Sequence, residues 1–559
     1  MHNIQPRYLS LSELLLGRLF RIPNYQRAYS WEKQHRFVLF EDLKKLYNKG
    51  PDESHFMASI VCLKKEKKKL GADNFEIMEI VDGQQRITTL ILMLNALKLN
   101  LDNNTKQAKK VSREMCELLV KDEGGDLLLL QTNHDTSHFF ENYLISGNFD
   151  HPSKAKTIAD RNILSAMQEC NEFVCDWKRK GNSLIELASL LKNQLYFLLH
   201  EVSEAKTVYT VFECLNSRGL DVSWLDRLKS ILMGKAYELP NANNEEVIKE
   251  LHTKWSSIYS IIGLNLGMNS QILRYAATLK STKRESRVTS ETDSVEILKQ
   301  QSSSAREIRN TAAWLLKICD KCSEIANDKP MACVARINHA RLLATAIKLS
   351  EFSETQKSEL LRVWECVTFR IFGMMQKDSR SKVGDYVRLA WSMINEKLPY
   401  RNALTQLLEI GSDYPIQKAA EALANRDCYN KWESELRYFL HEYDRHLESQ
   451  DGIQSNEENW QSIWRKPAQL SIEHIQPQSS SDDSRKHRLG NLLVIPPRLN
   501  SKLQAKVPRK KSKHYRETGL RVAIEVANIV DASGWNGKSI RQRETQLIEW
   551  AKIRWSDDA

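Results

Sequence analysis

Hydrophobic and polar positions along the chain predict a mostly helical protein with a few short strands. An apolar strand that ends in Ile80 and Val81 leads into Asp-Gly and then into a long helix through Thr-Thr-Leu-Ile-Leu-Met-Leu at residues 88–94. Near the C-terminus two short apolar strands are expected, one ending at His474 and one opened by Asn491. The helical stretch after them is expected to cover the core of a small domain through Trp535, Ile540, Leu547, Trp550 and Trp555.

The segment from about residue 236 to 450 is predicted to be mostly helical. Two amphipathic faces mark it, one formed by Ala312, Leu315, Leu316 and Cys319, the other by Leu360, Leu361, Trp364 and Val367. The polar stretch from Ser281 to Ser304 predicts an exposed loop.

Length and composition bound the class of protein. A chain of 559 residues is too long for one core and predicts roughly three to five domains or subdomains. We expect boundaries that give segments 1–235, 236–455 and 456–559. The hydrophobic content of 41% and the charged content of 27% are typical of soluble globular proteins. Because we find neither a membrane-length apolar run nor a signal-peptide pattern, a cytoplasmic location is expected.

The ten cysteines are dispersed, which fits a reducing compartment. Cys319 and Cys322 form a lone Cys-x-x-Cys pair without a second pair at zinc-ribbon spacing. We therefore expect buried helix cysteines in place of a structural zinc site.

The most informative motif joins the two C-terminal strands. Glu473 and His474 close the first strand, Asn491 opens the second, and Asn500 follows on a basic helix. This order predicts a ββα-metal nuclease. Phosphodiester hydrolysis needs a base that can deprotonate water near neutral pH, and an imidazole with an ordinary pKa of about 6.5 suits that task, so His474 is the candidate base.

The same motif offers oxygen ligands for a metal ion. Glu473 supplies a carboxylate and Asn500 an amide oxygen, a set that favours Mg²⁺ or Mn²⁺ over Zn²⁺. Asn491 could hold the active-site loop so that one imidazole nitrogen of His474 faces the water. The alternative is that these are ordinary strand-end and turn residues.

Charge is concentrated beside this motif. From Asn456 to Ala559 there are 19 Lys and Arg against 12 Asp and Glu, a net of +7 out of +11 for the whole chain. Such cations would contact DNA phosphates in a salt-dependent, sequence-independent manner, although a solvated charge run is the alternative. The expected DNA-binding residues are Arg498, Lys502, Lys506, Arg509, Lys510, Lys511 and Lys513.

A second motif lies near the N-terminus, in residues 20–31 and 79–90. A strand that reaches Gly83 and then a helix N-terminus is phosphate-binding geometry, because free backbone N–H groups converge there. Arg27 and Arg86 could bind phosphate oxygens, and Asp82 could hold Mg²⁺ or orient the attacking water. A capping box formed by Asp82 and Gln85 is the local alternative. Since the chain has no Walker A motif, nucleotide hydrolysis here would not belong to the P-loop class.

A third motif, at residues 212–220, places polar side chains around a turn that opens a helix, followed by Asp226 and Lys229. Its local alternative is a helix-turn-helix joint with Gly219 as the C-cap.

Together these motifs resemble the GmrSD-type modification-dependent restriction endonucleases. The likeness covers about residues 8–235 and 456–556. It implies a mainly α fold with α+β parts: an N-terminal ParB/sulfiredoxin-like NTPase domain with the Asp-Gly-Gln-Gln-Arg signature, a helical middle, and a C-terminal HNH-like nuclease domain. The implied activity is hydrolysis of an NTP, such as GTP, UTP or CTP, coupled to nicking or cutting of double-stranded DNA, typically modified phage DNA.

The resemblance also assigns residues. The implied nucleotide site contains Gln26, Arg27, Asp82, Gly83, Gln84, Gln85, Arg86, Asn216, Arg218 and Asp226. Cleavage would be carried by His474, Asn491 and Asn500. The chain departs from one form of the pattern, because Asn500 stands where other members have His.

Different functions stay open at this stage. The chain could be a nucleotide-switched DNA-binding or abortive-infection factor without nuclease turnover, or its N-terminal part could be a scaffold. The sequence also leaves open which NTP and which DNA modification are used, whether hydrolysis starts or restrains cutting, and the oligomeric state, a homodimer included.

Overall fold

The computed structural model describes residues 6–23, 26, 28–70, 73–102, 104–120, 129–132, 137–202, 223–238, 244–265, 267–424, 426–452, 457–479 and 485–557. The chain divides into two compact units, one made of Met1–Leu273 and Glu291–Cys319, the other of Arg274–Ser290 and Asp320–Ala559. Within the described ranges, no helix is both long enough and apolar enough to cross a membrane.

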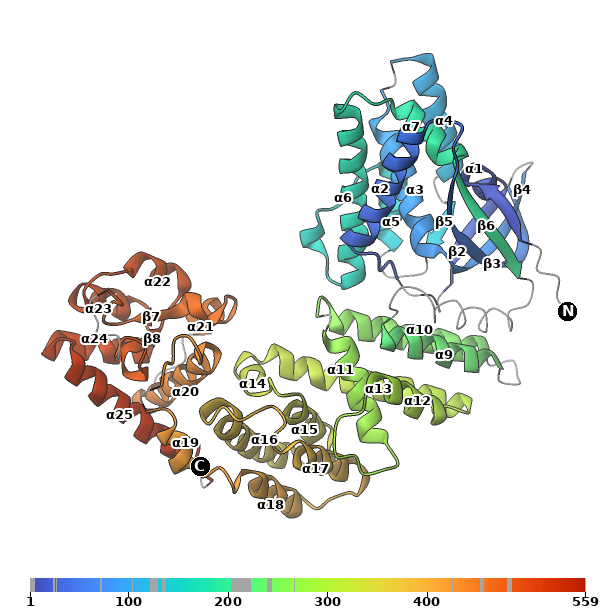
Figure 1. Cartoon of the computed structure of the whole chain (residues 1–559). Helices are drawn as coiled ribbons and strands as arrows, with labels where there is room; N and C mark the ends of the chain where they lie inside the picture. Colours follow the sequence, from blue (N-terminus) through green and yellow to red (C-terminus); the bar gives the residue numbers. More distant parts are fainter. Residues whose placement is uncertain are drawn as a thin grey trace. The chain divides into compact units, whose positions relative to one another are not determined.

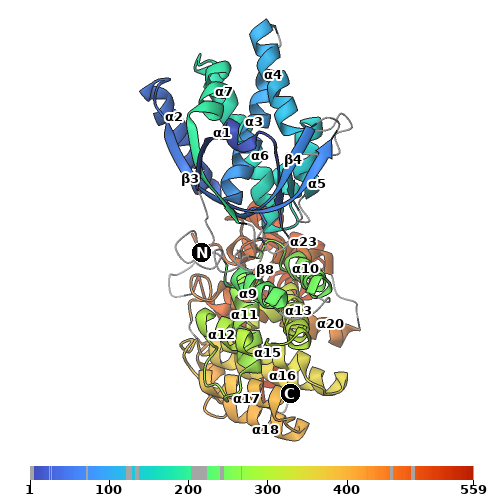
Figure 2. The ribbon, with the colours of Figure 1, turned by 90° about the vertical axis from the view of Figure 1, so that its right-hand side faces the viewer.

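The first unit contains a mixed six-stranded sheet in the order β1-β6-β3-β4-β2-β5. Its strands are β1 (Arg7–Ser10), β2 (Arg18–Ile22), β3 (His55–Leu70), β4 (Asp73–Asp82), β5 (Leu130–Thr132) and β6 (Leu195–Val202). The β2–β4, β2–β5 and β3–β6 pairs are parallel, whereas β1–β6 and β3–β4 are antiparallel. The sheet is curved, with helix α3 (Gln84–Asn100) on its inner side (Figure 2).

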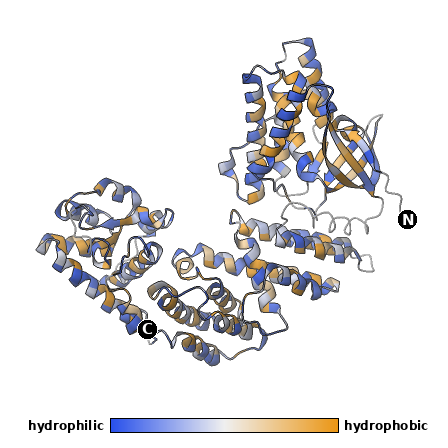
Figure 3. Cartoon of the chain, viewed as in Figure 1, coloured by the Kyte–Doolittle hydropathy of each residue, from blue (hydrophilic) through white to orange (hydrophobic). Residues whose placement is uncertain are grey.

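Helix α3 is the centre of this unit's core. Thirteen of its 17 residues are buried, which explains why it is apolar all round and not amphipathic. Apolar residues dominate both this helix and the strands beside it (Figure 3). The other helices of this part are α1 (Leu11–Leu15), α2 (Lys33–Lys49), α4 (Lys106–Leu119), α5 (Ser137–Ser146), α6 (Ile158–Arg179) and α7 (Leu184–Asn193).

The described remainder of the first unit is helical (Figure 1). It contains α9 (Trp224–Glu238), α10 (Asn244–Ile262), the first half of α11 (Gly267–Lys280), α12 (Glu291–Gln300) and α13 (Ala305–Asn327) as far as Cys319. The prediction of an exposed loop from Ser281 to Ser304 is wrong, because α12 lies inside it and buries Val295 and Leu298. On α13, Ala312, Leu315 and Cys319 are buried as predicted.

The second unit begins with helices and ends with a hairpin. The helices are α14 (Lys329–Val334), α15 (Asn338–Leu349), α16 (Glu354–Thr368), the π-helix η2 (Phe369–Met374), α17 (Val383–Asn395), α18 (Tyr400–Gly411), α19 (Ile416–Glu421), α20 (Glu433–Asp451) and α21 (Glu457–Trp464). Leu360, Trp364 and Val367 of α16 are buried.

The C-terminal part of this unit holds the two predicted strands, β7 (Ile472–His474) and β8 (Leu492–Val494). Around them lie the short helices η3 (Ala468–Ser471) and η4 (Leu489–Asn491), then α22 (Pro497–Leu503), α23 (Pro508–Glu517), α24 (Arg521–Ser533) and α25 (Gly537–Arg554). The expected apolar face of the last helix is present, since Ile540, Leu547 and Trp550 are buried. The predicted fold class, mainly α with α+β parts, is confirmed.

Candidate active site

A cavity of about 340 Å³ opens at the end of β7, in the second unit. His474 and Asn500 both line it, so the fold brings together two predicted site residues that are 26 positions apart in the sequence. The complete lining is Tyr429, Gln469, Ile472, Glu473, His474, Pro477, Gln478, Ser479, Asn500, Gln504 and Ala505.

The hairpin fixes where His474 lies. Strands β7 and β8 are antiparallel, with Ile472 opposite Val494 and His474 opposite Leu492. All six residues of the two strands are buried, so the register is set by packing on both faces. His474 is the last residue of β7, where its ring can reach the cavity while its backbone stays in the ladder.

The His474 ring is only 7% exposed and has a partner at each nitrogen. Its Nε2 lies 3.0 Å from Nδ1 of His487, and its Nδ1 lies 3.2 Å from the amide nitrogen of Gln478. The ring of Tyr429 packs edge-on against it at 4.6 Å. Burial is the main cause that lowers the pKa of His474 to about 4, and repulsion between the protonated forms of His474 and His487 acts in the same direction. The imidazole is therefore neutral at neutral pH and able to accept a proton.

Asn500 is oriented by two backbone carbonyls. Its Nδ2 donates to the carbonyl oxygens of Leu470 and Ile472, both at 3.0 Å. Because these bonds use both amide hydrogens, the oxygen Oδ1 is the amide atom that remains for a ligand in the cavity.

Glu473 belongs to a buried ion pair beneath the cavity. Its Oε1 accepts a hydrogen bond from the Tyr515 hydroxyl at 2.9 Å and lies 2.5 Å from Nζ of Lys511. Lys511 also donates to the His474 carbonyl oxygen at 2.7 Å. Burial raises the pKa of the Glu473 carboxyl, although Lys511 opposes that effect. This carboxylate therefore braces β7, and only its other oxygen is left for a cation.

The position of Lys511 corrects the expected set of DNA-binding residues. Its side chain is fully buried, so its ammonium group cannot reach a phosphate. By contrast, the remaining predicted cations are exposed and none of them forms an ion pair with a described residue. These are Arg498, Lys502, Lys506, Arg509, Lys510 and Lys513, on and between α22 and α23.

Asn491 is fully buried and uses its whole side-chain amide inside the protein. Its Oδ1 accepts hydrogen bonds from the Gln476 backbone at 2.9 Å and from Nε1 of Trp535 at 3.2 Å. Its Nδ2 donates to the carbonyl oxygens of Gln476 and Lys486 at 3.1 and 3.0 Å. Asn491 therefore ties the loop after His474 to the loop before β8. It has no atom left for a metal ion, and its contribution to cleavage stays a prediction.

A buried arginine that the sequence analysis missed supports the same loop. Nη1 of Arg543 donates to the carbonyl oxygens of Gly490 and Leu492 at 3.1 and 2.8 Å, on either side of Asn491. Helix α25 lies so close that a Cβ at Gly490 would be 2.0 Å from the Ile540 carbonyl oxygen. The spacing of the motif gave no signal for Arg543, which lies 52 residues after Asn491.

The oxygen donors of the cavity fit Mg²⁺ or Mn²⁺ better than Zn²⁺. Among the described residues there is no cluster of three His, Cys, Asp or Glu side chains that could hold a metal ion. Mg²⁺ commonly keeps several waters and takes few protein oxygens in addition to substrate phosphate oxygens. Asn500 Oδ1 and the second Glu473 oxygen are compatible with such a site.

The predicted N-terminal motifs meet in the first unit. Nε2 of Gln26 donates to the Val81 carbonyl oxygen at 2.5 Å, and the Gln85 amide bonds the backbone of Ala28 and Ser30 at 3.3 and 2.8 Å. The capping-box alternative is therefore wrong, because Gln85 binds a distant segment and the N-cap of α3 is Gly83.

Gly83 determines how the backbone enters helix α3. Gly83 has a left-handed backbone with φ of 95°, which places the N-terminus of α3 directly after Asp82. Gln84 is buried, whereas Arg86 is exposed and its guanidinium carbon lies 6.0 Å from the Trp31 ring centroid.

Asp226 is used within the protein. Its carboxylate accepts hydrogen bonds from the Tyr259 hydroxyl and from the Ser223 hydroxyl, the latter at 2.7 Å, and the Ser223 oxygen in turn accepts from the Asp226 backbone N–H at 3.2 Å at the start of α9. The role of Asp226 in nucleotide binding stays a prediction. Arg27, Asn216 and Arg218 lie outside the described residues.

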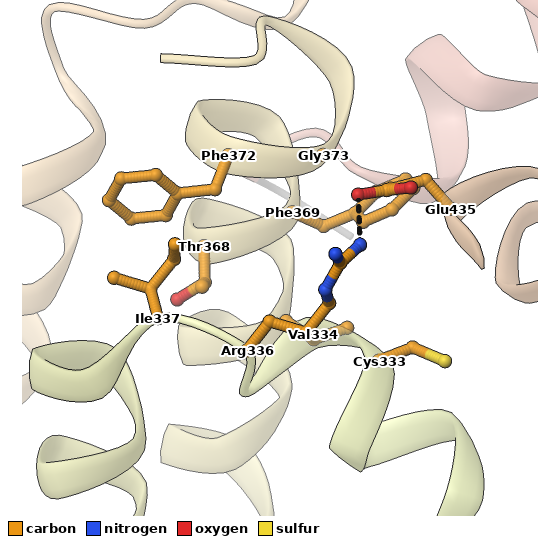
Figure 4. Close-up of a pocket in the computed structure, with 9 residues that line it drawn as sticks. All are labelled: Cys333, Val334, Arg336, Ile337, Thr368, Phe369, Phe372, Gly373 and Glu435. Atoms are coloured by element: carbon orange, nitrogen blue, oxygen red, sulfur yellow. Dashed lines mark hydrogen bonds and ion pairs between the residues drawn. The ribbon is translucent and has the colours of Figure 1, made fainter. Parts of the chain in front are cut away.

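A second cavity, of about 260 Å³, lies between α14, the π-helix η2 and the start of α20 (Figure 4). Phe369 and Phe372 form apolar walls, and Arg336 and Glu435 form an ion pair of 2.7 Å at one side (Figure 4). No histidine is among the residues that line it, and its carboxylate is neutralised by Arg336.

Comparison with known families found a match in each of the two units. The model for the GmrSD restriction endonuclease N-terminal domain matches residues 11–233, and the model for the GmrSD C-terminal domain matches residues 414–550. Together these are 223 and 137 residues, or 360 of 559. A search among curated proteins found no match. The chain therefore belongs to the GmrSD family of restriction endonucleases, enzymes that cut DNA in defence against foreign DNA.

Proposed function

We propose that this endonuclease cleaves DNA by HNH-type hydrolysis in the cavity at the end of β7, with His474 as the general base and Mg²⁺ or Mn²⁺ as cofactor. The observation that carries the proposal is the shared cavity of His474 and Asn500, which places a neutral imidazole beside an amide oxygen suited to a hard cation.

The chemistry follows from the atoms in that cavity. Once a water molecule replaces the Gln478 amide at Nδ1 of His474, this nitrogen takes a proton from the water, and the water oxygen forms a bond to phosphorus. The bond between phosphorus and the leaving 3′ oxygen breaks, and that oxygen takes a proton from solvent. When bound, the divalent cation supplies positive charge at the phosphate. Asn500 and the second oxygen of Glu473 would hold it.

The exposed cations of α22 and α23 would position the DNA. Two of the six lie on α22, the helix that carries Asn500, and the others follow it as far as α23; contacts to phosphates there would align the DNA backbone without reading sequence. This arrangement supports double-stranded DNA as the ligand of the surface next to the cavity.

We further propose that the N-terminal unit binds and hydrolyses an NTP and that this controls cutting of modified DNA. Support comes from the left-handed Gly83 at the start of α3, the exposed Arg86, and the union of the two N-terminal motifs through Gln26 and Gln85. Because Asp226 already accepts a hydrogen bond from Tyr259, this part of the proposal rests mainly on Asp82, Gly83 and Arg86.

The test uses the purified full chain with modified and unmodified phage DNA, each with and without Mg²⁺ and with GTP, UTP, CTP or ATP. We expect Mg²⁺-dependent nicking or cutting that one NTP changes. Asp82→Ala should abolish NTP turnover, and His474→Ala should abolish cleavage while NTP turnover continues. Cleavage that survives EDTA would contradict the role of the cation.

One observation favours the alternative that the protein binds DNA without cleaving it. Glu473 Oε1 is already bound by Lys511, so the cavity offers few protein ligands to a metal. DNA binding that is insensitive to EDTA, without a single nick, would show a nucleotide-switched DNA-binding factor instead.

A further inference from the structure

A second histidine, His487, contacts the proposed base from the loop between β7 and η4. Its Nδ1 lies 3.0 Å from Nε2 of His474, and the two ring centroids are 5.2 Å apart. His487 is four residues before Asn491 and was not part of the predicted motif.

The hydrogen bonds around His474 define its tautomer. The amide nitrogen of Gln478 can only donate, so the His474 nitrogen that it contacts at 3.2 Å, Nδ1, must be the acceptor. The proton of the neutral ring is therefore on Nε2. The contact of 3.0 Å to His487 is then a hydrogen bond from Nε2–H of His474 to Nδ1 of His487.

His487 is itself held in place by the segment before α20. The Cys428 backbone N–H donates to the His487 carbonyl oxygen at 2.9 Å. The ring of Tyr429 stacks on the His487 ring with centroids 5.0 Å apart and an interplanar angle of 10°. The same tyrosine contacts His474 edge-on, so one aromatic ring fixes the orientation of both imidazoles.

We propose that His487 is a positioning residue for cleavage: it accepts the Nε2–H of His474, holds that ring in one tautomer, and so keeps the lone pair of Nδ1 on the cavity side, where a water molecule can replace the Gln478 amide. The inference rests on the proposed role of His474. His487 neither touches the phosphate nor takes a proton in this account.

Loss of the acceptor would leave the buried Nε2–H of His474 without a partner and allow the other tautomer. In serine proteases the wrong histidine tautomer lowers kcat about 10⁴-fold, and a general base contributes roughly 10² to 10⁴-fold. We therefore expect His487→Leu to slow single-turnover cleavage by about 10² to 10⁴-fold while the Kd for DNA stays within about twofold.

The decisive variant is His487→Asn, because the Asn side-chain oxygen can stand near the place of Nδ1 and accept the same hydrogen bond. This variant should cleave DNA at least about tenfold faster than His487→Leu. His446→Leu, on α20 and outside the cavity, is the matched control and should cleave like the parent. Supercoiled plasmid with Mg²⁺ is the substrate, and melting temperatures of all variants are measured alongside.

Two results would overturn the inference. The first is cleavage by His487→Leu within about threefold of the parental rate, when His474→Ala is inactive in the same assay. The second is a His487→Asn variant that melts like the parent but stays as slow as His487→Leu. If His474→Ala itself cleaved at the parental rate, the proposed function would fail instead, and the two failures are thus distinguishable.

Discussion

The buried pair of Lys511 and Glu473 allows a sharp test of how the active-site strand is held. Lys511→Met removes the ammonium group that contacts both Oε1 of Glu473 and the carbonyl oxygen of His474. The Glu473 carboxylate, 4% exposed, would then keep the Tyr515 hydroxyl and the His474 backbone N–H as donors but would have no positive charge beside it. Removing one partner of a buried ion pair costs about 3–5 kcal/mol, because the other charge remains buried.

A double-mutant cycle separates the charge from the packing. Glu473→Gln keeps an acceptor for Tyr515 but removes the charge that Lys511 neutralises. We therefore expect the double variant to be more stable than Lys511→Met alone by about 2 kcal/mol, since it leaves no unpaired buried charge.

The assay is hydrogen exchange of the full chain, followed on peptides that cover residues 472–495. Lys511→Met should lower the opening free energy of these peptides and leave those of α3, in the other unit, unchanged. Lys502→Met, an exposed cation on α22, is the matched control. Two results would refute this expectation. One is a decrease of less than about 1 kcal/mol in the opening free energy of these peptides in Lys511→Met, and the other is a double variant whose opening free energy is as low as that of Lys511→Met.

Further predictions concern pH, packing and salt. The His441 and Arg554 contacts lower the pKa of Glu442 to about 2 despite its burial, so its stabilisation is complete above pH 4.5 and is lost as pH falls toward 2. Glu442→Gln should lower the free energy of unfolding at pH 6, measured by urea titration, by an amount on the order of 3 kcal/mol, and should weaken the loss of stability below pH 4.5. Gly490→Ala should destabilise the second unit by about 1–3 kcal/mol, seen in thermal unfolding, because its Cβ meets the backbone of α25. Arg509→Ala with Lys510→Ala should weaken DNA binding and reduce the slope of log K against log salt by about 2, measured by titration at several salt concentrations.

The sequence predicted the hairpin well because its signal is local. Short apolar runs ending at His474 and opening after Asn491 correspond to β7 and β8, and Asn500 lies on the following helix as expected. The meeting of the two N-terminal motifs was expected from their shared chemistry, and Gln26 and Gln85 provide the contacts.

The other residues at the cavity could not be predicted, because they meet through contacts between segments that are distant in the sequence. Tyr429 lies 45 residues before His474 and reaches the cavity from the loop before α20. His487 stands in a basic run without any periodic signal. Lys511 was assigned to DNA because of its charge, yet it shares a helix face with Tyr515 four residues later, and that face packs on Glu473.

The most direct test of the account is single-turnover cleavage of supercoiled plasmid with Mg²⁺, comparing the parent with His474→Ala at concentrations where both bind the DNA fully. We predict that the variant binds DNA with parental affinity but cleaves it at least about 10²-fold more slowly. Cleavage by His474→Ala at the parental rate would contradict it.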